Sequence, residues 1–148
     1  MNKYTLTLLC ILTCGFCFSA TAQSNIIETK NPCAEVYSED GGFITDPKAV
    51  IVEPSYKGGD KKLYKFLSEN VSYPDKAIER RITGTVLLKF VVEKDGSITN
   101  IEIARSVARD IDEECIRVVK KMPRWKPGTV NGKPAKFRYC LPIAFDLQ

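Results

Sequence analysis

The densest group of side chains that could transfer protons comprises four carboxylates, Asp110, Asp112, Glu113 and Glu114. Paired carboxylates act as general acid and base when their surroundings separate their pKa values. These four, however, open a run with apolar residues at helical spacing, and negative charge in a first helical turn complements the helix dipole. The chain also has no histidine, the commonest general base and zinc ligand. We therefore interpret the cluster as structural and expect a protein that is not an enzyme and uses no cofactor or metal.

Cysteine chemistry is the second possibility, because the chain has six cysteines. Three lie in the first 17 residues and three follow, namely Cys33, Cys115 and Cys140. No pair has the spacing of metal ligands. An odd number of later cysteines allows at most one internal bridge, and whether any disulfide forms among them stays open. Cys115 falls on the apolar stripe of a predicted helix, which favours an inert core residue.

Trp125, between Pro123 and Pro127, could form a platform for a partner. A lone tryptophan after a helix more often fills the gap between helix and sheet, and we expect that core role. The neighbouring basic residues could dock an anionic surface or simply form a solvated helix face; they are Arg117, Lys120, Lys121, Arg124 and Lys126.

The N-terminus indicates export. Lys3 precedes an uncharged, largely apolar run over 5–18, and small residues at 20–22 form a cleavage site. We expect a signal peptide over 1–22, cleaved after Ala22, and a periplasmic location. The alternative is an inner-membrane anchor from an uncleaved N-terminal segment, and the mature N-terminus, measured by mass spectrometry, distinguishes the two.

Charge and composition divide the remaining chain at Gly58. Residues 23–57 hold 3 basic and 6 acidic residues, whereas residues 58–148 hold 18 and 12. The first part is expected to be an irregular lead segment with at most one strand, at Ala49–Val52, and the second a single domain. A basic exported domain favours anionic surfaces or acidic partner segments. Because no nucleic-acid-binding motif is present, nucleic acid is not an expected partner.

Periodicity predicts the elements that position these residues. Helices are expected over 61–70, 75–81 and 110–122, the first capped by Asp60. Strands are expected over 85–93, 97–104 and 136–147, with a two-residue hairpin turn at Asp95-Gly96 and a turn at Asn131-Gly132. The class is therefore α+β.

Simple geometry then orders the strands. The first and second form a hairpin, and the helix returns the chain before the third, so an all-antiparallel sheet has the order 2-1-3. Pro142 in the third strand cannot donate to a ladder, which places that strand at an edge. We expect a small three-stranded antiparallel sheet with helices on one face.

Several short motifs, in order and at matching spacing, resemble the TonB C-terminal domain family. They are Tyr73-Pro74, Gly84 before a β-rich run, FVVEKDG over 90–96, MPRWKPG over 122–128, NGKP over 131–134 and PIAF over 142–145. The lead-in PSYKGG over 54–59 resembles the form in gut-type Gram-negative relatives, so the resemblance covers residues 54–148. The chain shows neither a long proline-rich spacer nor a histidine in its apolar N-terminal segment, and we expect a short form of the family.

The resemblance implies a protein-binding function that supports energy-dependent transmembrane transport. Such domains grip an extended segment of an outer-membrane TonB-dependent transporter by β-strand addition, and inner-membrane motor proteins are candidate further partners; no small-molecule substrate is implied. The alternative is a free periplasmic adaptor that binds another envelope protein without transmitting force.

The strand pattern locates the binding edge. Because Pro142 is tolerated most easily with its nitrogen facing outward, alternation directs the main-chain groups of Lys136, Arg138 and Cys140 outward as well. The family resemblance adds Ser72 and Tyr73 as neighbours of the bound segment. These five residues are the expected partner-binding site.

Overall fold

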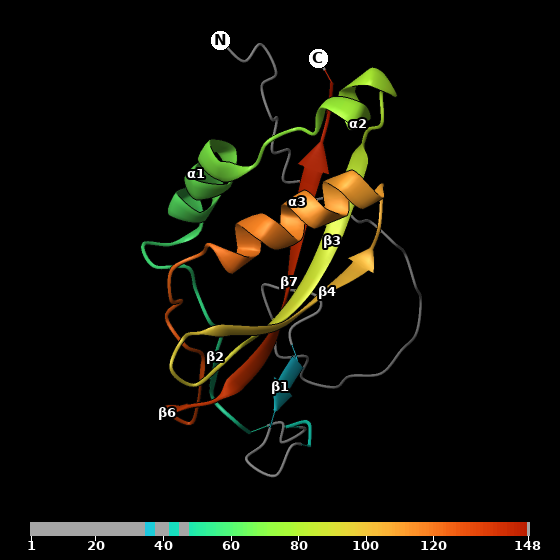
Figure 1. Ribbon diagram of the computed structural model, residues 1–148. Helices are drawn as coiled ribbons and strands as arrows, with labels where there is room; N and C mark the ends of the chain where they lie inside the picture. Colours follow the sequence, from blue (N-terminus) through green and yellow to red (C-terminus); the bar gives the residue numbers. More distant parts are fainter. Residues whose placement is uncertain (1–34, 38–41, 45–47, 148) are drawn as a thin grey trace, which may run out of the picture.

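The computed structural model describes residues 35–37, 42–44 and 48–147 (Figure 1). Helices form where the apolar stripes predict them, and the three long strands lie within a few residues of their expected bounds. The elements in chain order are β1 Glu35–Tyr37, β2 Ile51–Val52, α1 Asp60–Asn70, α2 Asp75–Glu79, β3 Gly84–Val92, β4 Ile98–Arg105, α3 Arg109–Lys120, β5 Thr129–Val130, β6 Lys133–Pro134 and β7 Lys136–Phe145. The predicted signal peptide lies outside the described residues.

The main sheet is antiparallel, with the order β1-β7-β3-β4. Its three long strands have the expected order 2-1-3, with β3 in the centre, and the α+β class is confirmed. The expectation of at most one strand in the lead segment is wrong, because β1 adds a fourth strand beside β7 and β2 joins a second small sheet with β5 and β6.

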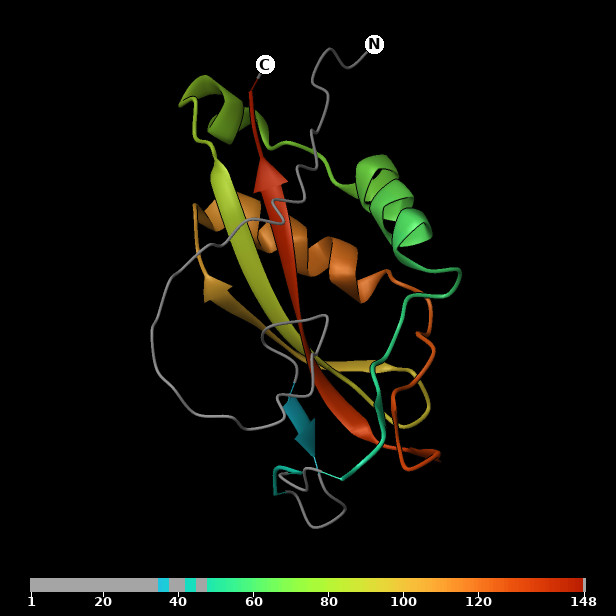
Figure 2. The ribbon, with the colours of Figure 1, turned by 180° about the vertical axis from the view of Figure 1, so that it is seen from behind.

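All three helices pack on one face of the main sheet, with α3 crossing its strands (Figure 1). Figure 2 shows the sheet from its other side, with α3 behind it. The apolar stripe of α3 faces alternate residues of β3, as periods of 3.6 and 2 require. The buried contacts include Leu63 and Leu67 from α1, Ile111, Cys115, Val118 and Val119 from α3, and Val86, Leu88, Phe90 and Val92 from β3. Trp125 joins this cluster, so its expected core role is confirmed.

The β3–β4 hairpin turns in a different way from the one expected. Gly96 N–H donates to the Glu93 carbonyl at 2.9 Å, and Glu93 N–H donates to the Ser97 carbonyl at 2.9 Å. With Gly96 at φ 81°, this is a three-residue loop that ends in a glycine bulge and not the two-residue turn expected at Asp95-Gly96. The turn at Asn131-Gly132 is confirmed, with both residues at positive φ.

The packed unit begins before Gly58. Ser55 exchanges main-chain hydrogen bonds with Lys126 at 3.0 and 2.8 Å, and Tyr56 is buried in the core. The expected cap of α1 by Asp60 is wrong: Gly59 occupies the cap position without a side-chain hydrogen bond, and Asp60 lies in the first turn. Within the described ranges, no helix is both long enough and apolar enough to cross a membrane.

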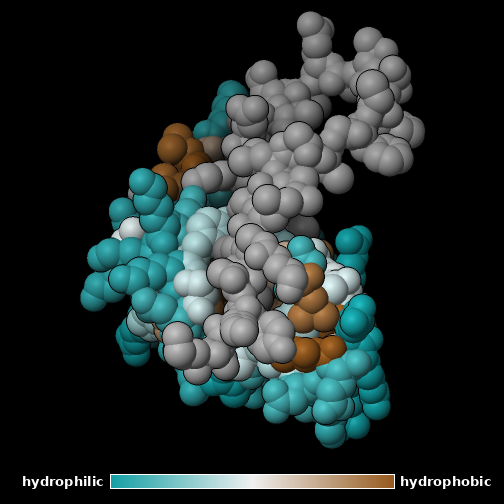
Figure 3. All heavy atoms as spheres, turned by 90° about the horizontal axis from the view of Figure 1, so that it is seen from above, coloured by the Kyte–Doolittle hydropathy of each residue, from teal (hydrophilic) through white to brown (hydrophobic). Residues whose placement is uncertain are grey.

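The end of the molecule that carries α2 is mostly hydrophilic. Viewed from above, described side chains are largely teal, and brown atoms form only small groups (Figure 3). In this view the described surface that the grey atoms leave visible shows no broad apolar area.

Candidate functional site

The outer edge of β7 is the candidate site. On its inner side β7 pairs with β3 along its length, from Val92↔Phe137 to Gly84↔Phe145. On its outer side, β1 covers only the first three residues, with Glu35↔Arg138, Val36↔Phe137 and Tyr37↔Lys136 opposite one another. Two of the predicted partner-binding residues, Lys136 and Arg138, thus already face a strand of the same chain.

A single hydrogen bond establishes which way the main chain points at this edge. Ile44 N–H donates to the Val36 carbonyl at 3.0 Å, so Val36 directs its main-chain groups away from β7. Neighbours along a strand point to opposite sides, and Glu35 and Tyr37 therefore direct theirs toward β7. The main-chain groups opposite them, those of Arg138 and Lys136, point outward, in the direction that Pro142 predicts.

Side chains also hold β1 to this edge. The Arg138 guanidinium lies 2.6 Å from a Glu35 carboxylate oxygen and 5.5 Å from the centre of the Tyr37 ring. The two charged side chains are 34% and 43% exposed, so water still screens their attraction. Val36 is buried in a small apolar cluster with Phe137 and Ala135. The contact thus combines one apolar residue with partly solvated polar interactions.

Lys136 is tied to the β3–β4 hairpin. Its ammonium lies 3.0 Å from a Glu93 carboxylate oxygen. Burial raises the pKa of the Glu93 carboxyl, but hydrogen bonds with Thr99 and Lys136 outweigh it and hold the pKa below its ordinary value. The Lys136 side chain is therefore oriented, while its main chain faces outward.

Cys140 and Pro142 lie beyond the end of β1 on the same edge. Cys140 stands opposite Lys89 and is buried outside the helix-facing core, whereas Pro142 is exposed opposite Leu87. Cys115 lies on the buried face of α3, where burial raises the pKa of its thiol to about 12. Its burial in the core is as expected, and a raised pKa disfavours the reactive thiolate. Cys33 lies outside the described residues.

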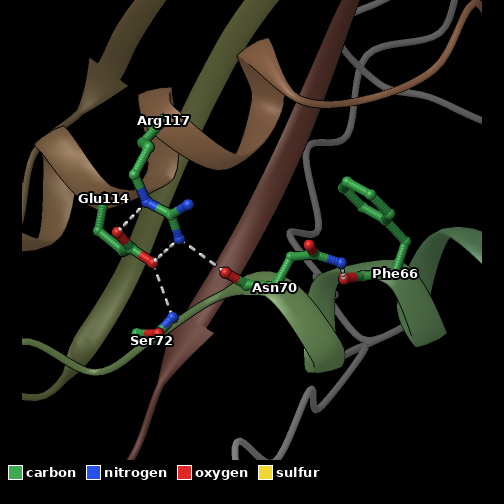
Figure 4. Close-up of polar contacts among 5 residues, drawn as sticks. All are labelled: Phe66, Asn70, Ser72, Glu114 and Arg117. Carbon is green, nitrogen blue, oxygen red and sulfur yellow. Dashed lines mark hydrogen bonds and ion pairs between the residues drawn. The ribbon is translucent and has the colours of Figure 1, made fainter.

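Ser72 lies in the connection between α1 and α2, held against α3 (Figure 4). Ser72 N–H donates to a Glu114 carboxylate oxygen at 2.7 Å. The Arg117 guanidinium donates hydrogen bonds to both oxygens of the same carboxylate, at 2.6 and 2.7 Å. It also donates to the Asn70 carbonyl at 2.8 Å. One ion pair thus fixes the connection at two points.

Tyr73 continues this connection to the far end of β7. Its hydroxyl donates to the Ile82 carbonyl, and its ring meets Phe145 edge-on, with centroids 5.3 Å apart. Arg138 and Phe145 are separated by about 24 Å, at roughly 3.4 Å per strand residue. The predicted site residues therefore form two groups at opposite ends of the β7 edge, Lys136 and Arg138 at one and Ser72 and Tyr73 at the other, with Cys140 between them.

We predict that Glu114→Gln destabilises the protein by about 1–2 kcal/mol near neutral pH, because a charge-assisted hydrogen-bond network is lost. Burial raises the Glu114 pKa, but hydrogen bonds from Arg117 and Ser72 outweigh it and lower the pKa from its ordinary 4.5. A carboxyl group whose pKa is lower in the folded than in the unfolded protein stabilises the fold at pH values above its unfolded pKa. This stabilisation is lost as the pH falls through its folded-state pKa. The difference between wild type and variant should therefore shrink below about pH 4.5.

Urea unfolding at several pH values measures this difference. Glu113→Gln is the matched control, since Glu113 pairs with Arg109 on an exposed surface at 2.9 Å. This control should change stability little. An equal loss in both variants, or a difference independent of pH, would contradict the assigned role of Glu114.

Asp112, in the same acidic group, also has a structural role. Asp112 accepts hydrogen bonds from the Ser106 hydroxyl and from Val107 N–H, the latter at 3.3 Å, at the start of α3. In the parts of the chain that the structure describes, no three His, Cys, Asp or Glu side chains are grouped to hold a metal ion. This geometry supports the structural interpretation of the acidic cluster.

Sequence reasoning missed β1 and the role of Glu35. Three residues are too few for a period to be recognised, and the partner Arg138 is 103 positions away. The only local signal is the acidic character of the lead segment beside a basic domain. Sequence reasoning also missed the Glu114–Arg117 pair, although its spacing of three on a helix is typical of interacting residues.

Comparison with known proteins points to one family. The family model for the Gram-negative bacterial TonB protein C-terminal matches residues 69–147. Two curated relatives named Protein TonB, from Xanthomonas campestris pv. campestris strains B100 and ATCC 33913, are each 31% identical over 77 residues, which is 51% of this chain and 34% of theirs. The match thus spans about a third of the length of these relatives.

A similar solved structure is the NMR solution structure of Helicobacter pylori TonB-CTD, residues 194–285. It is 26% identical, covers 60% of this chain and 92% of its own, and superposes with a TM-score of 0.46.

Proposed function

Because the chain belongs to the family of Gram-negative bacterial TonB protein C-terminal domains, we propose that its folded part binds an extended segment of an outer-membrane transporter. The segment adds as a strand to the outer edge of β7, and main-chain hydrogen bonds supply most of the affinity. The domain acts as a binding component of energy-dependent transport and not as an enzyme. The observation that carries this proposal is the pairing of β1 with the outer edge of β7, an intramolecular example of a strand at this edge.

The length of the edge supports a single continuous contact. Main-chain groups of Lys136 and Arg138 point outward at one end, and the Ser72–Tyr73 connection lies at the other. A segment that extends from Lys136 toward Pro142 points its end at that connection. Pro142 offers no N–H, so regular pairing weakens there and side-chain contacts take over.

The proposal places the domain in the periplasm, between the two membranes that such transport connects. Membership of the family and the predicted signal sequence over 1–22 support this location. The domain is expected in the soluble periplasmic fraction, with a mature chain that begins at Gln23. Recovery of the intact chain in inner membranes after carbonate washing would contradict it.

Backbone N-methylation tests the edge directly. A chain covering residues 23–148 can be assembled by ligation at Cys115, with one methyl group on the Arg138 or the Tyr139 nitrogen. The protein methylated at Arg138 should no longer bind the peptide. Its fold should lose only about one hydrogen bond, which lowers the free energy of unfolding by roughly 1 kcal/mol. Methylated Tyr139 should damage the fold, because its N–H faces β3.

The binding probes are synthetic peptides that tile the periplasmic segments of the outer-membrane transporters of the source organism. Fluorescence anisotropy measures binding, and urea unfolding measures stability. If methylation at Arg138 unfolds the protein and methylation at Tyr139 does not, the assigned alternation is off by one residue. If neither change affects binding, strand addition at β7 is wrong.

A further inference from the structure

The contact between β1 and β7 uses the same main-chain groups that a partner strand would need. Glu35 and Tyr37 face Arg138 and Lys136 with their main chains. An incoming strand cannot pair with these two residues while β1 remains in place. Partner binding at this end of the edge therefore requires β1 to detach.

The interactions that hold β1 against β7 are ones that another strand could make in its place. It is three residues long, its ion pair with Arg138 is partly solvated, and only Val36 is buried. Its side-chain pattern is acidic, apolar, aromatic. The Arg138 guanidinium contacts two side chains of β1, the carboxylate of Glu35 and the ring of Tyr37. When β1 leaves, Arg138 loses its carboxylate, and a new strand replaces that interaction only if it brings another.

We propose that β1 is an internal occupant of the β7 edge, displaced by a partner segment that carries an acidic side chain opposite Arg138. This inference rests on the proposed function and adds to it the chemistry of the partner and the competitor it meets. Charge supports the pairing, since residues 23–57 hold 6 acidic and 3 basic residues whereas residues 58–148 hold 12 and 18.

Tethering makes even a weak occupant effective. A segment joined to the domain by a short chain reaches an effective concentration in the millimolar range. The apparent affinity for a partner is then reduced by the fraction of molecules in which the edge is open. The occupant also covers the exposed main-chain groups of an edge strand, which otherwise invite pairing between molecules.

The decisive variant is Glu35→Arg, which places two like charges where the ion pair was. Its matched control is Glu79→Arg, the same charge change on the exposed surface of α2. Glu35→Gln is a milder second variant that removes the attraction without adding repulsion. The double variant Glu35→Arg/Arg138→Glu restores an attractive pair with reversed charges.

Two readouts are measured on the full chain. Amide hydrogen exchange at Lys136 and Arg138 reports whether β1 is attached, and the probe is a labelled peptide with the sequence Ala-Glu-Val-Tyr-Ser of residues 34–38. Glu35→Arg should raise exchange at both amides and bind the probe about tenfold more tightly than wild type, a change of about 1.4 kcal/mol. Glu35→Gln should move both readouts the same way by less, Glu79→Arg should match wild type, and the double variant should regain protection.

Several outcomes overturn the inference. If exchange at Lys136 and Arg138 is unchanged in both Glu35 variants, the ion pair does not hold β1. If exchange rises but the probe binds no better, or if Glu35→Gln lowers the melting temperature without tighter binding, β1 is a permanent part of the fold. A different outcome bears on the proposed function alone. If the probe binds as predicted but no transporter peptide binds, β1 still occupies the β7 edge, and the proposed function is wrong.

Discussion

Replacing Trp125 with alanine is expected to lower the free energy of unfolding by about 3–5 kcal/mol, as for other large core aromatics. Trp125 is 3% exposed and stands edge-on to three aromatic rings. The centroid distances are 5.8 Å to Tyr56, 5.4 Å to Phe90 and 4.8 Å to Tyr139. These rings come from the lead-in, the central strand and β7, so one side chain joins three separate segments.

Circular dichroism during urea unfolding measures this loss, because the variant has no tryptophan left for fluorescence. Trp125→Phe keeps an aromatic ring in the same space and should lose clearly less stability. Unchanged unfolding of Trp125→Ala, together with lost peptide binding, would show that Trp125 contacts the partner and does not support the fold.

The second large effect is expected for Gly96→Ala, in the hairpin beside Trp125. Gly96 has φ 81°, and an added Cβ would lie 2.0 Å from the Trp125 carbonyl oxygen. Trp125 N–H also donates to the Gly96 carbonyl at 2.8 Å, so the two backbones cannot separate without losing that bond. We expect a loss of about 2–5 kcal/mol, from left-handed backbone strain of about 1–2 and overpacking of about 1–3.

Gly132→Ala separates these two causes. Gly132 has φ 80°, almost the same as Gly96, but apart from Gly132 and its two chain neighbours no residue has an atom within 4 Å of the added Cβ. This control should therefore show only the strain, about 1–2 kcal/mol. Thermal and urea unfolding of both variants give the comparison. Equal losses at the two positions would mean that the approach of Gly96 to Trp125 adds no constraint.

Local patterns account for most of the fold. The alternation of Tyr139, Leu141 and Ile143 predicts which face of β7 is buried, because side chains alternate across any strand. The stripe of α3 predicts the face it turns to the sheet. Pro142 predicts that β7 is an edge strand and which of its main-chain groups face outward; β7 is at the edge only beyond Arg138, because β1 pairs with its first three residues. Each of these features depends on neighbours within a few residues, so a single sequence contains the necessary information.

Other features depend on contacts between distant residues, which no local pattern reveals. The hairpin loop at Gly96 follows the pairing of β3 with β4 and the approach of Trp125, and it overrides the two-residue preference of Asp95-Gly96. The β1 strand pairs with a segment about a hundred positions away, where Arg138, 103 positions from Glu35, supplies a countercharge. The separation of Ser72 from Arg138 likewise follows from where Glu114 anchors the connection after α1. Residue types therefore predicted the proposed binding edge and the direction of its main-chain groups, whereas tertiary contacts decided that β1 lies along part of it.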